Sequence, residues 1–169
     1  GGSGDDTLTA STSSSTSVID QVNTLIGGAG NDILTANNGK SILTGGAGND
    51  TFVINTASYT VDYASTITDL GSGDIIKFAN ATSFVKLTDT PDLDGNPNLS
   101  AFANAAINEV GLNTMVWFQY NNNTYIVMET ATDSSTFTNG EDFIVKIAGL
   151  VDLGTGASYN ATSNTLEIA

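Results

Sequence analysis

Large apolar residues recur with a nine-residue period in the first third of the chain. Residues 27–35 read GGAGNDILT, residues 36–44 read ANNGKSILT, and residues 45–53 read GGAGNDTFV, with no gap between them. Residues 1–9 read GGSGDDTLT and fit the same template. Self-similarity at a short fixed period is the sequence signature of stacked repeats, so we expect a repetitive coil here.

Two kinds of nonapeptide alternate in this coil. Residues 18–26 fit the template weakly, through the spacing of Leu25 only, and residues 10–17 read as an insertion of small residues. With the insertion set aside, acidic glycine-rich units alternate with plain ones, which suits a flattened coil with two nonapeptides per turn. Glycine-rich turns starting at Gly1, Gly27 and Gly45 would then stack on one side. The eighth position of the five units holds Leu8, Leu25, Leu34, Leu43 and Phe52.

Beyond the repeats, the pattern predicts further strands and one helix. A helix over 99–110 follows from the helical spacing of its apolar residues, with Asn98 as its N-cap. Three asparagines at 121–123 predict the turn of a hairpin, and 87–98 read as a loop. Strands are expected over 51–57, 61–69, 75–78, 115–120, 124–128, 143–147 and 165–168.

The charge balance narrows the possible partners. The chain has 18 acidic residues against 4 lysines, no histidine, and a formal net charge of −14. This excess of negative charge argues against nucleic acid and anionic membranes, which are bound through lysine and arginine, and favours cations. With 40% hydrophobic residues, the chain is expected to form a core. Because cysteine is absent, a metal is the expected substitute for disulfides.

Several other functions have little support in the sequence. Without histidine and cysteine the common nucleophile–base pairs cannot be assembled, so we expect no enzyme. The segment 92–96 is rich in aspartate but lacks the spacing of an EF-hand, which favours a polar turn. We find no signal peptide and no apolar run long enough to span a bilayer. The chain begins in mid-motif without methionine, and we expect it to be a piece of a longer protein.

Four aromatic residues near the hairpin raise the question of a carbohydrate platform. They are Trp117, Phe118, Tyr120 and Tyr125. On alternating strands such residues more often form core contacts and cross-strand pairs, which is the expectation here.

The glycine-rich turns have the chemistry of a calcium site. Glycine permits positive φ and close backbone approach, so such a turn can direct carbonyl oxygens inward. Stacked strands lie about 4.7–4.9 Å apart, and calcium takes six to eight oxygens at about 2.3–2.6 Å, so an ion midway between two rungs reaches both. Asp32 and Asp50 would face one ion from neighbouring rungs. Without it, two carboxylates about 5 Å apart repel by roughly 3 kcal/mol at an effective dielectric constant near 20.

The unit GGxGxDxUx, in which U is a large apolar residue, resembles the RTX nonapeptide repeat of proteins exported by type I secretion. The resemblance implies a parallel β-roll with calcium between successive turns. The implied side-chain ligands are Asp6, Asp32 and Asp50, at the sixth position. The implied carbonyl ligands, at the first, third and fifth positions, are Gly1, Ser3, Asp5, Gly27, Ala29, Asn31, Gly45, Ala47 and Asn49.

The plain units depart from this pattern, since residues 36–44 carry Ser41 in place of the aspartate. Calcium is therefore expected on one side of the roll only. One site is expected between the turns at Gly1 and Gly27, and another between the turns at Gly27 and Gly45.

A third calcium site is suggested by residues 66–76, TITDLGSGDII. This stretch resembles the segment that closes the roll in RTX proteases and lipases, and Asp69, Gly71 and Asp74 carry the resemblance. An ordinary Asp-Gly turn is the alternative. The resemblance thus implies two to three calcium ions.

The C-terminal half resembles the C-terminal regions of type I-secreted bacterial surface-layer (S-layer) proteins, in 116–127, 140–153 and 164–169. The fold class expected is mostly β: a parallel β-roll with a capping turn over 1–78, then an antiparallel β unit with one helix over 79–169. The latter would serve as cap and secretion signal.

The resemblance implies a structural protein, secreted to the extracellular space or cell surface, that folds on meeting calcium. Its partners would be calcium, the type I secretion machinery and further copies in a lattice. The export module of a secreted metalloprotease or lipase, or the end of an RTX adhesin, remains an alternative.

Overall fold

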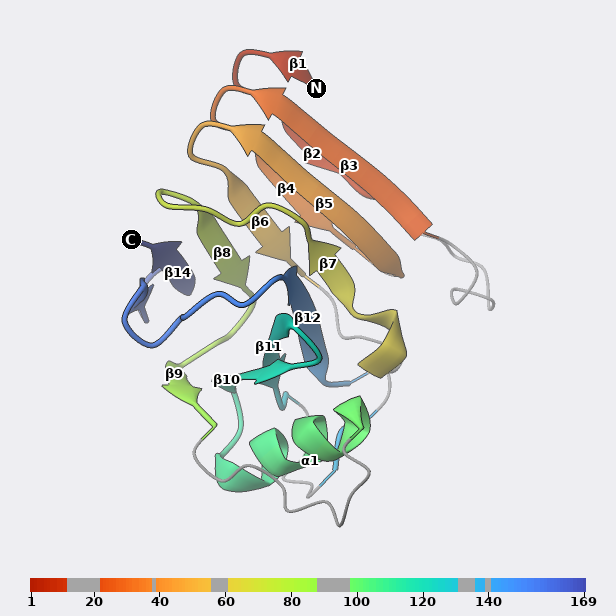
Figure 1. Ribbon diagram of the computed structural model, residues 1–169, viewed down its shortest axis with the longest axis vertical. Coiled ribbons are helices and arrows are strands. Elements are labelled where there is room, and N and C mark those ends of the chain that lie inside the picture. The colour runs from red at the N-terminus through yellow and green to blue at the C-terminus, as the bar shows by residue number, and fades with distance from the viewer. Residues whose placement is uncertain (12–21, 38, 56–60, 88–97, 131–135, 139–140) are drawn as a thin grey trace.

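A computed structural model describes residues 1–11, 22–37, 39–55, 61–87, 98–130, 136–138 and 141–169 (Figure 1). The predicted insertion at 10–17, the loop at 87–98 and the aspartate-rich segment at 92–96 fall wholly or mostly outside these ranges. The strands are β1 Gly2–Ser3, β2 Thr7–Thr9, β3 Val22–Ala29, β4 Ile33–Ala36, β5 Lys40–Ala47, β6 Thr51–Ile54, β7 Ser65–Ile67, β8 Ile75–Phe78, β9 Ser83–Lys86, β10 Thr114–Tyr120, β11 Asn123–Met128, β12 Phe143–Ala148, β13 Ala157–Asn160 and β14 Thr165–Ile168. The helices are the 3-10 helix η2 Val61–Tyr63 and the α-helix α1 Leu99–Glu109.

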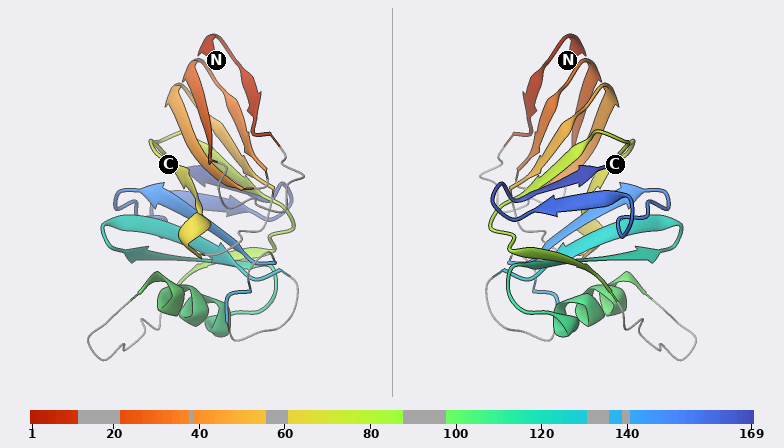
Figure 2. Two further views of the ribbon diagram at one scale, coloured as in Figure 1. Left: turned by 90° about the vertical axis from the view of Figure 1, so that its right-hand side faces the viewer. Right: turned by 90° about the vertical axis from the view of Figure 1, so that its left-hand side faces the viewer.

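The strands form two sheets. The long sheet has eight strands in the order β1-β3-β5-β7-β12-β11-β10-β9, and the short sheet has six in the order β13-β14-β8-β6-β4-β2. Figure 2 shows the two sheets edge-on as facing layers, with α1 at the end of the molecule away from the N-terminus. Parallel pairing dominates the first half and antiparallel pairing the second, which confirms the predicted mostly-β class with a β-roll and one helix.

The eighth position of the nonapeptides forms the core of the roll. Leu8, Leu34 and Phe52 stand opposite one another in the short sheet, and Ile76 continues the row. A second row in the long sheet consists of Leu25, Leu43 and Ile67. Consecutive nonapeptides therefore go to opposite sheets, as the alternation of acidic and plain units predicts. Because side chains alternate between the two faces of a strand, a shift of one residue would turn every eighth-position side chain away from the core. The nine-residue apolar period therefore fixes this register.

The C-terminal half continues both sheets. β12 pairs in parallel with β7, and β14 pairs antiparallel with β8, so each sheet crosses the predicted boundary at residue 78. One apolar core between the sheets includes residues of both halves, from Leu34 to Leu166. The division into two units stays a prediction.

Helix α1 covers part of the outer face of the long sheet, over strands β10 and β11. Ala103, Ala106 and Ile107 of the helix pack with Val116 and Val127 of the sheet. The helix begins as predicted, because the Asn98 side chain accepts a hydrogen bond from the backbone N–H of Ala101 at 2.9 Å.

The hairpin between β10 and β11 is also as predicted. Asn121 and Asn122 have φ of 46° and 60°, the left-handed region that asparagine tolerates. Trp117, Phe118 and Tyr125 are buried, so three of the four aromatic residues belong to the core, as expected.

Part of the strand prediction is wrong. Residues 61–69 were expected to form one strand, but the chain forms η2 first and then only the short strand β7. Val61 and Ala64 are both buried in the cluster under α1. This spacing of three places both side chains on one side of a single 3-10 turn, whereas a strand would point them to opposite faces.

Two strands have weak sequence signals. β9 is only four residues long, and β13 reads ASYN, which has little β-propensity. Within the described residues, none of the helices is long and apolar enough to cross a membrane.

We expect Leu34→Ala to destabilise the calcium-loaded protein by about 2–5 kcal/mol, because the side chain is fully buried between the sheets. Urea unfolding followed by circular dichroism measures this loss. Ile33→Ala is the matched control, since Ile33 is the preceding residue but 42% exposed, and its cost should stay under about 1 kcal/mol. Equal losses in the two variants would contradict the register described above.

Candidate metal centre

The glycine-rich turns stack in register along one side of the roll. We call residues 1–6, 27–32, 45–50 and 69–74 turns 1 to 4. Gly2, Gly28 and Gly46 stand opposite one another in turns 1, 2 and 3, as do Ser3, Ala29 and Ala47. Turns 2 and 3 are thus direct neighbours, and the left side of Figure 1 shows the stacked bends.

Only glycine permits this stacking at the second and fourth positions of turns 2 and 3. Gly46 has φ of +107°, and a Cβ there would lie 2.1 Å from the carbonyl oxygen of Gly28. Gly48 has φ of +135°, and its Cβ would lie 2.0 Å from the oxygen of Gly30. Both values are far inside van der Waals contact, so a side chain would push the turns apart.

The sixth-position aspartates form a ladder across the turns. The backbone N–H of Asp6 donates to Oδ1 of Asp32, and that of Asp32 donates to Oδ1 of Asp50, each at 2.8 Å. The N–H of Asp50 donates in the same way to Oδ1 of Asp74, also at 2.8 Å. Asp32, Asp50 and Asp74 are buried, so the ladder brings three carboxylates together away from water.

The second oxygen of these carboxylates points back into its own turn. A Cβ placed on Gly27 would lie 2.2 Å from Oδ2 of Asp32 and 2.6 Å from the carbonyl oxygen of Gly45. At Gly45 the carboxylate lies in the same way, since a Cβ there would be 2.2 Å from Oδ2 of Asp50. At Gly27 a carboxylate oxygen of one turn and a carbonyl oxygen of the next therefore line one cradle, which the missing side chain leaves open.

Oδ2 of Asp32 is buried and has no hydrogen-bond donor. An unpartnered buried carboxylate oxygen is costly, and a cation in the cradle would remove that cost. The donor set, a carboxylate together with backbone carbonyls, is the all-oxygen set that calcium prefers. The residues present therefore fit calcium.

Electrostatics in the ladder point the same way. Burial raises the pKa of the Asp50 carboxyl, and the nearby carboxylates of Asp74, Asp32 and Asp69 raise that pKa further. The hydrogen bond from the Asp32 backbone opposes these effects and lowers the pKa. A divalent ion between the turns would favour the ionised form of the same group.

The fifth position contributes a second ladder that the sequence did not predict. The N–H of Asn31 donates to Oδ1 of Asp5 at 2.7 Å, and the N–H of Asn49 donates to Oδ1 of Asn31 at 2.8 Å. These residues were expected to act through their carbonyls only. The recurrence of an amide or carboxylate side chain at this position was the available signal.

The third-position carbonyls already take part in the stacking. The oxygen of Ala29 accepts from the N–H of Gly4 at 2.6 Å, and that of Ala47 accepts from the N–H of Gly30 at 2.8 Å. A carbonyl oxygen has two lone pairs, so this bond leaves one for a metal. Ser3 stands in register with Ala29 at the outermost turn.

Turn 4 lies beside turn 3 but uses its carboxylates differently. The two oxygens of Asp69 accept from the N–H groups of Gly45 and Gly46, each at 2.9 Å. Oδ2 of Asp74 accepts from the N–H of Gly71 at 2.8 Å. Asp69 thus caps the backbone of turn 3, a role that the sequence did not predict. The third calcium site stays a prediction, with its carboxylate oxygens already hydrogen-bonded.

Among the described residues of the opposite side of the roll, no such acidic ladder is found. Asn23 stands opposite Ser41, and the N–H of Ser41 donates to the hydroxyl of Ser65 at 3.2 Å. These positions correspond to the sixth position of the plain units and carry no charge. In the described part of the chain, no three Asp, Glu, His or Cys side chains gather in a way that could hold a metal. The candidate sites therefore depend mainly on backbone oxygens, with few carboxylates at each.

Comparison with known families agrees with this geometry. A family model of the RTX calcium-binding nonapeptide repeat, in four copies, matches residues 1–15 and 20–52. The N-terminal part of the chain thus consists of RTX calcium-binding repeats, which supports placing the protein in the RTX family. RTX proteins bind calcium and are typically secreted. No curated protein matches the chain.

We expect Asp32→Ala to lower calcium affinity more than Asp6→Ala, by about tenfold or more, because Asp32 lies between two candidate sites and Asp6 borders one. Isothermal titration calorimetry measures both. Asp32→Asn is the matched variant, since it retains an acceptor for the N–H of Asp6 and removes only the charge. Equal affinities in the alanine variants would refute the sharing of Asp32.

We expect Gly46→Ala to weaken calcium-dependent folding, because its Cβ would collide with turn 2. Gly149→Ala separates this collision from backbone strain: Gly149 also has a positive φ, +89°, but nothing lies within 4 Å of its Cβ position. Calcium titrations followed by circular dichroism should show a clearly higher midpoint for Gly46→Ala. Matching midpoints would show that the turns do not need close approach.

Proposed function

We propose that this chain is the calcium-triggered folding module of a type I-secreted S-layer protein, with a structural and not a catalytic role. The observation that carries the calcium part of the proposal is the buried Oδ2 of Asp32, which lacks a donor and faces a carbonyl of the next turn. A roll with such an atom buried in its stacked turns would be poorly stable until a cation binds there.

Calcium concentration then acts as the switch. Extracellular calcium modules have dissociation constants of about 10⁻⁴–10⁻³ M, far above the calcium level of a cytosol. The chain would stay loose before export and fold outside. Each site contributes about 1.4 kcal/mol at tenfold saturation, so two or three sites decide the folding of a marginal domain.

The C-terminal half would act as the cap on which the roll is built. The N–H of Gly73 donates to the carbonyl of Ile168 at 2.8 Å, and the N–H of Ile168 donates to the carbonyl of Asp74 at 2.9 Å. The last strand therefore holds turn 4, which in turn caps turn 3 through Asp69. This coupling supports the capping role of residues 79–169, and the proposed export role draws only on the sequence resemblance of this region.

The S-layer assignment draws support from composition. The chain is rich in Thr, Ser, Asn and Ala and has no Cys or His, which suits a structural protein better than a catalyst. A net charge of −14 keeps single chains apart, and calcium would lower that repulsion during assembly into a lattice.

We expect circular dichroism of the chain to change from coil to β on addition of millimolar calcium, with no change on addition of magnesium. Magnesium demands a small octahedral site and gives up its waters reluctantly, so carbonyl-lined turns should not capture it. Identical spectra in calcium and in chelator would refute the folding switch. For the S-layer role, electron microscopy of the full-length protein should show two-dimensional lattices with calcium and none with chelator.

A further inference from the structure

Two of the four lysines line one small hollow on the outer face of the long sheet. Lys40 of β5 and Lys146 of β12 border a depression of about 180 Å³, together with Asp62, Thr66 and Tyr125. In the part of the chain that the structure describes, neither ammonium forms an ion pair. Two lysines against the single carboxylate of Asp62 leave an excess of positive charge in this hollow, which is unexpected in a protein with a net charge of −14 and would attract an anionic group locally.

The sheet register explains why the lysines converge. β7 lies between β5 and β12, and Thr66 stands opposite both Ile42 and Lys146. Lys40 precedes Ile42 by two residues and so points to the same face. This position is the edge of the area that α1 and η2 cover, where Val61 and Ala64 pack beside the helix.

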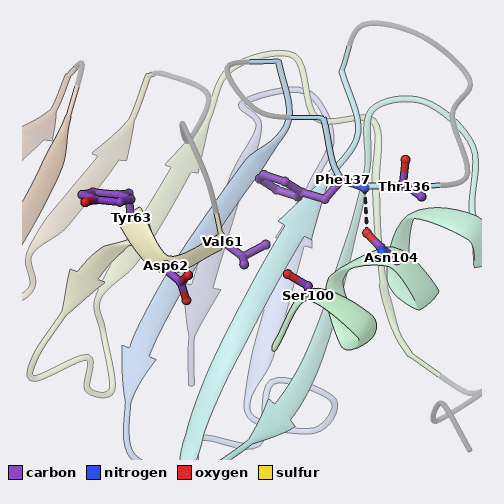
Figure 3. Close-up of a pocket in the computed structure, with 7 residues that line it drawn as sticks. All are labelled: Val61, Asp62, Tyr63, Ser100, Asn104, Thr136 and Phe137. Carbon is purple, nitrogen blue, oxygen red and sulfur yellow. Dashed lines mark hydrogen bonds between the residues drawn. The ribbon is translucent and has the colours of Figure 1, made fainter. Parts of the chain in front are cut away.

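A second hollow of about 440 Å³ lies between η2 and α1. Figure 3 shows the ring of Phe137 above this hollow, with the Asp62 carboxylate and the Ser100 hydroxyl below it. The N–H of Phe137 donates to Oδ1 of Asn104 at 2.8 Å, which ties the Phe137 segment to the helix. Val61 and Asp62 line both hollows, so the two lie side by side, and we call them together the groove.

The groups along the groove fall into two chemical kinds. At one end, an aromatic ring, a hydroxyl and a carboxylate offer an apolar surface beside hydrogen-bonding groups, which suits the C–H face and hydroxyls of a neutral sugar. At the other end, the ammoniums of Lys40 and Lys146 outnumber the Asp62 carboxylate that both hollows share, and together with the phenol of Tyr125 they suit an anion. Burial raises the pKa of Tyr125, as do nearby Tyr120 and Asp62, so its hydroxyl stays protonated and available as a donor.

We propose that this groove binds an acidic oligosaccharide, with the carboxylate or phosphate of one sugar at Lys40 and Lys146 and a neutral sugar against Phe137. The overall negative charge of the protein opposes extended polyanions and anionic bilayers, whereas Lys40 and Lys146 make one end of the groove locally positive. A ligand with a single acidic group beside neutral sugars fits both ends. The site is separate from the calcium turns and independent of the proposed folding switch.

The test is calorimetric titration of the calcium-loaded chain with 3′-sialyllactose, which has one carboxylate and two neutral sugars, against lactose. Trehalose 6-phosphate against trehalose tests phosphate as the source of the anion. We expect at least one acidic probe to bind about tenfold or more tightly than its neutral counterpart. Whichever acidic probe binds more tightly identifies the anion. Failure of both to exceed their neutral counterparts would overturn the proposal.

Variants locate the site on the groove. Lys146→Ala and Lys40→Ala should each weaken binding of the acidic probe about tenfold, and Phe137→Ala should weaken acidic and neutral probes alike. Lys77→Ala is the matched control, since Lys77 is an exposed lysine of β8 in the short sheet and its loss changes the net charge equally. Circular dichroism in calcium confirms folding of each variant. Equal losses for Lys77→Ala and both groove lysine variants would overturn the assignment.

Discussion

Close contact between successive turns is the constraint on which the rest of the structure depends. The ladder of backbone N–H groups donating to Asp32, Asp50 and Asp74 sets the turns one rung apart. The same spacing places carboxylates in a buried row, where backbone N–H donors offset only part of their mutual repulsion. Calcium would offset the remaining repulsion because twice its bond length to oxygen roughly equals the rung spacing. Its preferred ligands are oxygens, which the turns already present. Under the proposed function, folding and metal binding would be one event in this roll.

Much of the fold could be predicted because its period is encoded locally. The nine-residue recurrence of Leu34, Leu43 and Phe52 was enough to predict two nonapeptides per coil and the stacking of turns at Gly27 and Gly45. The short 3-10 turn at Val61 escaped prediction because its cause is burial against α1, a helix almost forty residues later in the sequence. Contacts of that kind leave no mark on the local pattern of apolar residues.

The sequence could indicate which residues of the candidate site carry oxygen atoms, but not which of those atoms are free to bind a metal. The sequence singled out position six as a source of calcium ligands, which stays a prediction. In the structure Asp32 uses one carboxylate oxygen for the backbone of the neighbouring turn and keeps only the other for the cradle. Asp69 resembled a ligand in the sequence, yet its carboxylate is engaged by the N–H groups of Gly45 and Gly46. A sequence identifies an oxygen-bearing side chain, and only three-dimensional structure reveals which of its lone pairs remain available.

The hydrogen bonds between Ile168 and turn 4 make strand β14 part of the stability of the calcium turns. A variant without β14 has no strand to hold Gly73 and Asp74 in turn 4. Because Asp69 of turn 4 caps the backbone of turn 3, turn 3 would lose support as well. Such a variant would remain partly unfolded and susceptible to proteolysis even at high calcium concentration. The stability of the calcium turns therefore depends on a strand that lies much later in the sequence.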